Sequence, residues 1–264
     1  MLEIRNIYTT FNPGTINEKK ALCGVKLHLD EGDFCTVIGS NGAGKSTMLN
    51  AVAGVWPVDE GQIIIDGVDV SAQCEHKRAT YLGRVFQDPM NGTAADMTIA
   101  ENLAMAARRG RRRTLRWGLT RKEQEGYRDL LASLELGLED RMTAKVGLLS
   151  GGQRQALTLL MATLQKPRLL LLDEHTAALD PKTATKVLHL TRKLVADNHL
   201  TALMVTHNMK DALHYGNRTI MMHEGRIVVD IDRETKNQLH VDDLLKMFEH
   251  SSGTAIENDR MLLG

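Results

Sequence analysis

The stretch from Gly39 to Thr47, GSNGAGKST, has residue types whose order and spacing suit phosphate binding. It matches the pattern G-x-x-x-x-G-K-S/T, in which glycines let the backbone turn tightly and bring N–H groups toward phosphate oxygens. Lys45 suits contact with the outer phosphates as a point charge, and Ser46 offers a hydroxyl to Mg²⁺. The pattern predicts a nucleotide site made by Gly39, Ser40, Asn41, Gly42, Ala43, Gly44, Lys45, Ser46 and Thr47.

The residues on either side of this loop supply the context that the chemistry needs. FCTVIG, from Phe34 to Gly39, is a nearly continuous apolar run that predicts a buried strand. The stretch after Lys45 has apolar residues at helical spacing, and Gly54 and Pro57 end it. A glycine-rich turn can match the pattern by chance, but a strand before the loop and a helix after it favour nucleotide binding.

An acidic pair follows a second apolar run, LLLLDE. Ligands of parallel α/β sheets lie beyond the carboxyl ends of strands, which is where Asp173 and Glu174 are expected. Asp173 suits the holding of Mg²⁺, and Glu174 suits a base that polarises the attacking water. Two acids that merely solvate the end of a strand are the simpler interpretation, and the phosphate loop argues against it.

The segment LSGGQRQ, from Leu149 to Gln155, resembles the signature of ATP-binding cassette (ABC) proteins and precedes LLLLDE, as in that family. Other family motifs occur in order, so the resemblance extends to about Glu249. They are Gln87 in VFQDP, the ALDP loop at Ala178–Pro181, and His207 in MVTHN. The aromatic residue that the family has near the start is Phe11, with Tyr8 as the second choice.

The resemblance implies that two copies of the chain enclose two ATP molecules with Mg²⁺, head to tail. Each nucleotide would lie between the Lys45 loop of one copy and the signature of the other. It implies catalytic roles for Glu174, His207 and Gln87, and metal contacts from Ser46, Gln87 and Asp173. It further implies ATP contacts by Phe11 through adenine stacking, and by Ser150, Gly151, Gly152, Gln153 and Asp180 across the interface. Glycines at a helix start suit close approach to a phosphate.

One residue departs from the family pattern. Many members have proline after the Asp-Glu pair, whereas this chain has His175. We expect His175 to pack in a loop near the interface and not to act as a catalytic base, because only its position beside Glu174 suggests such a role.

The order of the elements predicts an α/β fold, because apolar strands alternate with amphipathic helices and so indicate a mainly parallel sheet covered on both faces. Further strands are expected in GQIIIDG, at Ala202–His207 and in a hairpin turning at Glu224-Gly225, and a further helix at Lys182–His199. Residues 121–136 predict a helix whose apolar face carries Tyr127, Leu130, Leu131 and Leu134. The family adds a P-loop NTPase core with an antiparallel β subdomain. We expect one ATP-binding domain over residues 1–250, with a helical subdomain at about 91–144 that continues into the signature helix, and a flexible tail at 251–264.

Composition and charge argue against several classes of function. The formal net charge is +0, so a global footprint for nucleic acid is missing. The 3 cysteines have neither CxxC nor metal-ligand spacing. No apolar stretch is long enough to span a membrane, and no signal peptide is visible. The basic run Arg108–Gly118 allows contact with anionic lipid or with a transporter's loops, stacking of a nucleic-acid base on Trp117, or a solvated surface paired with Glu123 and Glu125.

The resemblance favours a transporter ATPase at the cytoplasmic face of the cell membrane. One phosphate loop and one signature without a fused membrane domain indicate an importer subunit, with transmembrane permease subunits, a second copy of itself and an extracytoplasmic substrate-binding protein as partners. TFNPGTINE, GVWPVDEG and DEHTAALDP resemble cassettes for aromatic amino acids, tyrosine or tryptophan. The alternatives are a branched-chain amino-acid importer, a soluble ATPase of the iron–sulfur assembly type, and a nucleic-acid machine. Plain LSGGQ argues against the iron–sulfur assembly type, and a single phosphate loop without long coiled coils argues against a nucleic-acid machine.

Overall fold

The computed structural model describes residues 1–110 and 118–252. Most of the basic run, including Trp117, and the tail from residue 253 lie outside the described residues.

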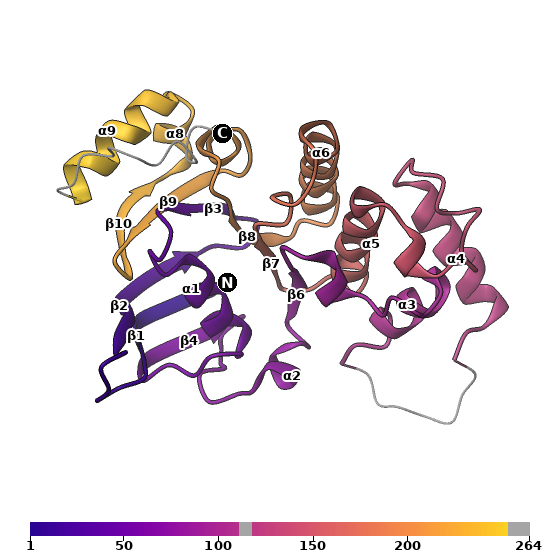
Figure 1. The fold of residues 1–264 in the computed structure, drawn as a ribbon, viewed down its shortest axis with the longest axis horizontal. Coiled ribbons are helices and arrows are strands. Elements are labelled where there is room, and N and C mark those ends of the chain that lie inside the picture. Colours follow the sequence, from indigo (N-terminus) through magenta and orange to yellow (C-terminus); the bar gives the residue numbers. More distant parts are fainter. Residues whose placement is uncertain (111–117, 253–264) are drawn as a thin grey trace.

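A six-stranded sheet forms the centre of the molecule (Figure 1). Its strand order is β10-β9-β3-β8-β7-β6, and neighbouring strands are parallel except for the antiparallel pair β10 and β9. The strands are β3 (Phe34–Gly39), β6 (Leu82–Val85), β7 (Leu169–Asp173), β8 (Thr201–Val205), β9 (Arg218–His223) and β10 (Arg226–Ile231). The predicted mainly parallel sheet is confirmed.

A four-stranded antiparallel sheet lies beside it, in the order β2-β1-β4-β5. Its strands are β1 (Leu2–Phe11), β2 (Lys19–Leu29), β4 (Glu60–Ile65) and β5 (Val68–Asp69). Helix α1 (Lys45–Ala53) buries Met48, Leu49 and Val52 in one hydrophobic cluster that includes residues of both sheets. Because α1 starts at the phosphate loop, this cluster fixes the loop against both sheets.

The faces of β7 explain why its sequence is apolar throughout. Leu169 and Leu171 contact the cluster around α1, whereas Leu170 and Leu172 contact a cluster on the other face. Helices α5 (Gly151–Thr163) and α6 (Pro181–Asp197) contribute to that second cluster. A strand buried on both faces cannot alternate apolar with polar residues, as the sequence predicted.

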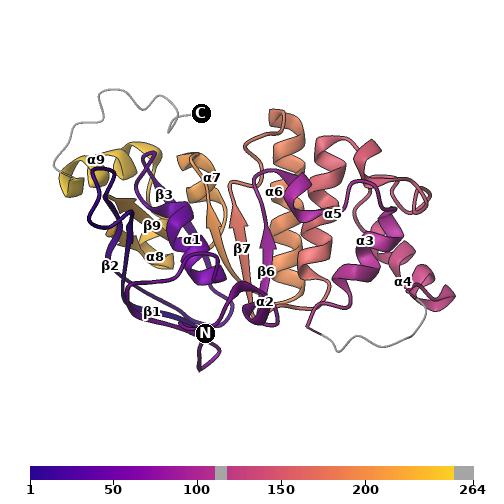
Figure 2. The ribbon, with the colours of Figure 1, turned by 60° about the horizontal axis from the view of Figure 1, so that its bottom comes forward.

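A helical region lies at the end of the molecule opposite the four-stranded sheet (Figure 2). It contains α3 (Ile99–Ala106), α4 (Arg121–Ala132) and the short helices η1 (Pro89–Gly92) and η2 (Val146–Leu148), and α2 (Glu75–Arg78) precedes it in the chain. It has its own hydrophobic cluster, shared with α5. Tyr127, Leu131 and Leu134 are buried there, but the prediction for Leu130 was wrong, because its side chain is 36% exposed.

The C-terminal helices cover the edge of the sheet formed by β9 and β10. They are α7 (Met209–His214), α8 (Arg233–Lys236) and α9 (Val241–Ser252). Leu244 and Phe248 of α9 pack with residues of β9 and β10. The predicted hairpin turn is present, with positive φ at Glu224 and Gly225.

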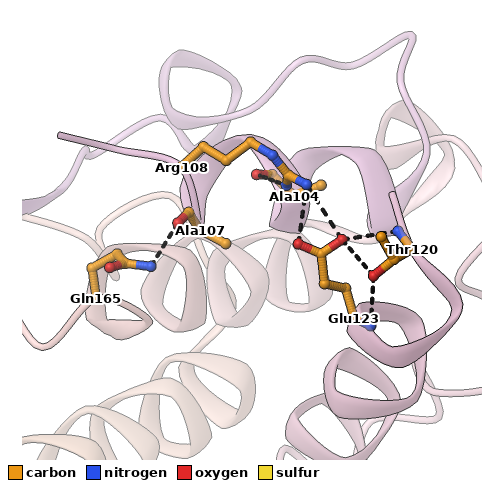
Figure 3. A network of polar contacts seen from close by, with 6 residues as sticks. All are labelled: Ala104, Ala107, Arg108, Thr120, Glu123 and Gln165. Atoms are coloured by element: carbon orange, nitrogen blue, oxygen red, sulfur yellow. Dashed lines mark hydrogen bonds and ion pairs between the residues drawn. The ribbon is translucent and has the colours of Figure 1, made fainter. Parts of the chain in front are cut away.

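The first arginines of the basic run are engaged within the helical region (Figure 3). Arg108 donates to the Ala104 carbonyl at 2.7 Å and to the Glu123 carboxylate at 3.0 Å. Arg109 donates to the Ala162 carbonyl of α5 at 3.1 Å. The predicted pairing with Glu123 is confirmed for Arg108, whereas Glu125 pairs with Arg121 instead. In the part of the chain that the structure describes, no helix has the length and apolar character to cross a bilayer.

Candidate nucleotide-binding site

The loop between β3 and α1 has a backbone that only glycine suits at two of its positions. Gly39 has φ +150°, and a side chain there would collide with the Met222 carbonyl. Gly44 has φ +99°, and its Cβ would lie 2.6 Å from the Ala21 carbonyl oxygen. The loop therefore keeps its curvature only with glycine at these positions.

Lys45 is held inside this loop. Its side chain is 6% exposed, and its Nζ donates to the carbonyls of Gly39 at 2.7 Å and Ser40 at 3.1 Å. Helix α1 starts at Lys45 without a side-chain cap. A helix start of this kind offers N–H groups and a positive dipole end to an anion.

A cavity of about 200 Å³ lies over the loop. It is lined by Phe11, Lys19, Ala21, Asn41, Gly42, Ala43, Gly44, Lys45, Ser46, Thr47 and Glu174. Residues from β1, β2, the phosphate loop and the end of β7 thus meet around one space. Sequence reasoning did not find Lys19 and Ala21, which pattern matching cannot place because they reach the cavity only through the pairing of β1 with β2.

Asp173 lies beside the loop, at the end of β7. Its Oδ1 accepts a hydrogen bond of 3.3 Å from the Ser46 hydroxyl, and its Oδ2 is 3.8 Å from Nη2 of Arg84. Burial raises the pKa of Asp173, and the Arg84 guanidinium opposes that shift. A hydroxyl and a carboxylate oxygen in contact are ligands that Mg²⁺ accepts, so these residues fit the metal.

Glu174 follows Asp173 and has φ +40°, an uncommon value for a residue other than glycine. Its N–H donates to the Val205 carbonyl of β8 at 3.1 Å. The side chain lines the cavity, with Oε2 3.9 Å from Nδ1 of His207. The pairing of β7 with β8 therefore brings the acid and the histidine together at one sheet edge.

Phe11 is the aromatic residue that lines the cavity. Its ring meets the ring of Trp56 edge-on, with centroids 5.4 Å apart. Tyr8 is not among the lining residues, and its hydroxyl lies close to Gly24 instead. Phe11 therefore has the better position to contact a base, and Trp56 is a neighbour that the sequence patterns did not identify.

The remaining candidates are not among the residues lining the cavity. Gln87 is exposed in the segment after β6. Ser150 caps the start of α5 in a capping box with Gln153, followed by Gly151 and by Gly152, which packs against Thr183. Asp180 caps α6, and its hydrogen bonds with Thr183 lower its pKa. The structure thus groups the phosphate loop, Asp173, Glu174, His207 and Phe11, and leaves the signature outside that group.

His175 is buried within the chain, at 2% exposure. Its place near an interface between two copies stays a prediction. Its Nε2 lies 3.0 Å from the Thr191 hydroxyl of α6. Burial lowers the pKa of His175 to about 4. The ring therefore stays neutral at pH 7 and joins the site loop to α6.

Comparisons with known proteins agree with this geometry. The family model described as "ABC transporter" matches residues 22–177. A tyrosine transport ATP-binding protein of Clostridioides difficile is 43% identical over 256 residues, which cover 95% of this chain and 100% of that protein. A phosphonates import ATP-binding protein of Alcaligenes faecalis is 32% identical, over 98% of this chain and 95% of that protein.

Solved structures show the same fold. A dimeric ATP-binding cassette in a post-hydrolysis state, bound to ADP and Pi, superposes with a TM-score of 0.76 at 28% identity, covering 88% of this chain and 99% of that one. The family match spans the phosphate loop, the signature and the acidic pair, and the relatives match over nearly the whole chain. This chain therefore belongs to the ABC transporter family, as one of its ATP-binding ATPase subunits.

Proposed function

We propose that the chain powers a multi-subunit importer of amino acids, with tyrosine or tryptophan as cargo. The observation that carries the ATPase part is that the Lys45 loop and Glu174 line one cavity, and that Asp173 accepts a hydrogen bond from Ser46 of the same loop. The relative from Clostridioides difficile, matched over its whole length, supports the cargo class. A branched-chain amino-acid importer is the second candidate, and a soluble ATPase of the iron–sulfur assembly type is the third.

In this proposal the loop residues bind the phosphates of ATP, and Phe11 stacks on adenine. Ser46 and Asp173 would hold Mg²⁺, with Gln87 completing the metal contacts. When bound, Mg²⁺ supplies positive charge that neutralises the phosphate oxygens. Glu174 orients the attacking water as a base, and His207, 3.9 Å away, supports it.

The signature would act on a second copy of the chain. Ser150, Gly151, Gly152 and Gln153 lie away from the cavity of their own chain, as expected if they face the nucleotide of a partner together with Asp180. Residues 1–250 would form one ATP-binding domain with a helical subdomain at about 91–144. Permease subunits would hold the chain at the cytoplasmic face of the membrane and link it to an extracytoplasmic substrate-binding protein.

The experiment is light scattering on Glu174→Gln, with and without Mg-ATP. We expect a monomer that becomes a dimer when ATP is added, because hydrolysis no longer opens the closed pair. The matched control is Glu174→Gln with Ser150→Arg, which should bind ATP and stay monomeric. If both variants stay monomeric while binding ATP, the two-copy site is wrong for the isolated chain.

A second experiment tests the cargo. The chain is expressed with its permease, and uptake of labelled tyrosine, tryptophan and leucine is compared. Uptake of leucine alone would favour the branched-chain alternative, and copurification without any membrane protein would favour the soluble ATPase.

A further inference from the structure

The guanidinium of Arg84 lies directly behind the acidic edge of the site. Arg84 belongs to β6, the strand next to β7, and its Nη2 is 3.8 Å from Oδ2 of Asp173. The two side chains are 14% and 16% exposed, so solvent screens this ion pair only in part. The contact is longer than a hydrogen bond and acts through charge.

Other contacts fix where this positive charge sits. Nη2 of Arg84 donates to Oδ1 of Asn50, on α1, at 2.6 Å. The guanidinium also lies over the ring of Phe86, with Cζ 4.5 Å from the ring centroid. A planar cation held by an amide and stacked on an aromatic ring has little freedom to turn.

The two oxygens of Asp173 consequently have different surroundings. Oδ1 accepts from Ser46, and Oδ2 faces Arg84. A charge on one side and a hydroxyl on the other set the plane of the carboxylate. The oxygen that faces Ser46 is thereby kept toward the place where a metal would be held.

Arg84 also costs folding free energy at its buried position. Burial lowers its pKa, and its Nε is buried with no hydrogen-bond partner among the described residues. A buried donor without a partner costs free energy, and an apolar side chain of similar size avoids that cost. The arginine therefore contributes something that an apolar residue cannot. Its contacts provide a fixed charge beside Asp173, and its Nη1 also lies 3.9 Å from Oε1 of the more exposed Glu75.

Phe86 extends these contacts toward the helical region. Its ring lies against Arg84, its carbonyl accepts from Nε2 of Gln155 on α5 at 3.2 Å, and Gln87 follows it in the chain. One guanidinium thus touches both the metal-side carboxylate and the residue before Gln87.

We propose that Arg84 is a positioning residue, which orients Asp173 toward Mg²⁺ and fixes the Phe86–Gln87 segment beside it. This inference rests on the proposed function, because it requires Asp173 to hold the metal. Groups behind a metal ligand typically change metal affinity by about 10- to 100-fold when removed.

The test is Arg84→Met, measured in Glu174→Gln so that hydrolysis is suppressed. ATP affinity is determined by calorimetry in EDTA and over a range of Mg²⁺ concentrations. We expect the Mg²⁺ concentration at which ATP affinity gains half of its Mg²⁺-dependent increase to rise by about 10- to 100-fold. ATP affinity in EDTA should stay unchanged, because the Lys45 loop is intact. Arg84→Lys should restore part of the loss, since it keeps the charge without the planar group.

Controls separate positioning from general damage. Arg109→Met removes another arginine, which donates to the Ala162 carbonyl of α5 and not to Asp173, and should leave the Mg²⁺ dependence unchanged. Asn50→Ala frees the guanidinium without deleting it and should shift the Mg²⁺ dependence in the same direction by less. In Asp173→Asn, adding Arg84→Met should change the Mg²⁺ dependence by less than it does when Asp173 is present, with only the effect through the Phe86–Gln87 segment remaining.

The outcomes are distinguishable. The role of Arg84 is wrong if Arg84→Met lowers ATP affinity in EDTA as much as it lowers affinity with Mg²⁺. It is also wrong if Arg84→Met and Asn50→Ala leave the Mg²⁺ dependence unchanged while Asp173→Asn abolishes it. In both cases the proposed metal site stands. If Asp173→Asn keeps the original Mg²⁺ dependence, the proposed metal site fails, and the role of Arg84 fails with it.

Discussion

The helix that starts at the phosphate loop and the helices of the helical region begin in opposite ways. Helix α1 has Gly44 at its start, with a left-handed backbone and no side-chain cap. Helices α3 and α4 each begin with a complete capping box, Thr98 with Glu101 and Thr120 with Glu123. The residues that would stabilise a helix start are therefore missing at the phosphate loop itself.

This difference shows how one chain divides stability and binding between two regions. A cap residue contributes about 1 kcal/mol but occupies the N–H groups that an anion needs. Around α1 the large cluster shared by both sheets supplies the stability instead. In the helical region a capping box stabilises the start of each of α3 and α4, and the Arg108–Glu123 contact joins the end of α3 to the start of α4 (Figure 3). The comparison predicts that changes at the phosphate loop affect nucleotide binding, whereas changes at the caps of the helical region affect stability.

The largest expected effect is on catalysis at Glu174. Glu174→Gln should slow ATP hydrolysis by about 10²- to 10⁴-fold, the usual contribution of a positioned base, while ATP binding persists. Single-turnover hydrolysis measures the rate, and calorimetry measures binding. Unchanged turnover would remove Glu174 from the role of base.

The second effect is on ATP affinity, and it compares a glycine of the phosphate loop with a glycine of the helical region. Gly44→Ala places a Cβ 2.6 Å from the Ala21 carbonyl at φ +99°, so the loop must move. Backbone strain of about 1–3 kcal/mol corresponds to a loss of ATP affinity of about 5- to 150-fold. The matched control is Gly126→Ala in α4, where a Cβ meets open space, and helix stability should rise by about 0.5–1 kcal/mol with ATP affinity unchanged. Equal ATP affinities of the two variants would contradict the contrast.

A third effect concerns a buried charge remote from the cavity. Lys236 is 4% exposed, donates to the Tyr215 carbonyl at 2.6 Å, and has its pKa lowered by burial to about 8. The unfolded chain, with a pKa near 10.5, binds more protons between these values, so the free energy of unfolding contributed by this group rises as pH increases from about 8 to about 10.5.

Lys236→Met should remove this pH dependence. The free energy of unfolding at pH 7 should rise by about 2 kcal/mol, because the cost of burying the charge exceeds the value of one hydrogen bond. Urea unfolding of both chains at pH 7 and pH 9.5 measures the difference, and ATP affinity should not change. A variant with the same pH dependence as the native chain would show that Lys236 is not the titrating group.

The smallest effect tests a cap. Thr120→Ala removes the hydroxyl that accepts from the Glu123 N–H, and should lower the free energy of unfolding by about 1 kcal/mol. Urea unfolding measures this change. A fall in ATP affinity as well would break the division between the two regions.

The sequence was sufficient where local pattern decides structure. The apolar runs predicted β3 and β7, the glycine spacing predicted the loop, and Glu224-Gly225 predicted the hairpin turn. Each depends on residues close together in the chain, since a positive φ favours glycine locally and burial on both faces leaves a continuous apolar run.

It was insufficient where distant residues decide. Periodicity could not separate Leu130 from Leu131, because a neighbouring helix determines which of them is covered. The edge contact of Phe11 with Trp56 and the place of Arg84 behind Asp173 depend on strand pairing and packing. The burial of His175 against Thr191 depends likewise on where α6 crosses, which no motif encodes.

The capping box at Ser150 has a consequence for how tightly two copies could hold together. The Ser150 hydroxyl already accepts from the Gln153 N–H at 3.3 Å, and Gln153 accepts from the Ser150 N–H in return. In the proposed pair, this hydroxyl can donate to a phosphate oxygen while it still accepts from the Gln153 N–H, because a serine hydroxyl is donor and acceptor at once. Closure then adds a contact without breaking the capping box, and helix α5 stays capped in both states. Replacement of Ser150 by glycine should remove the cap and the phosphate contact together, and the resulting pairs should separate faster.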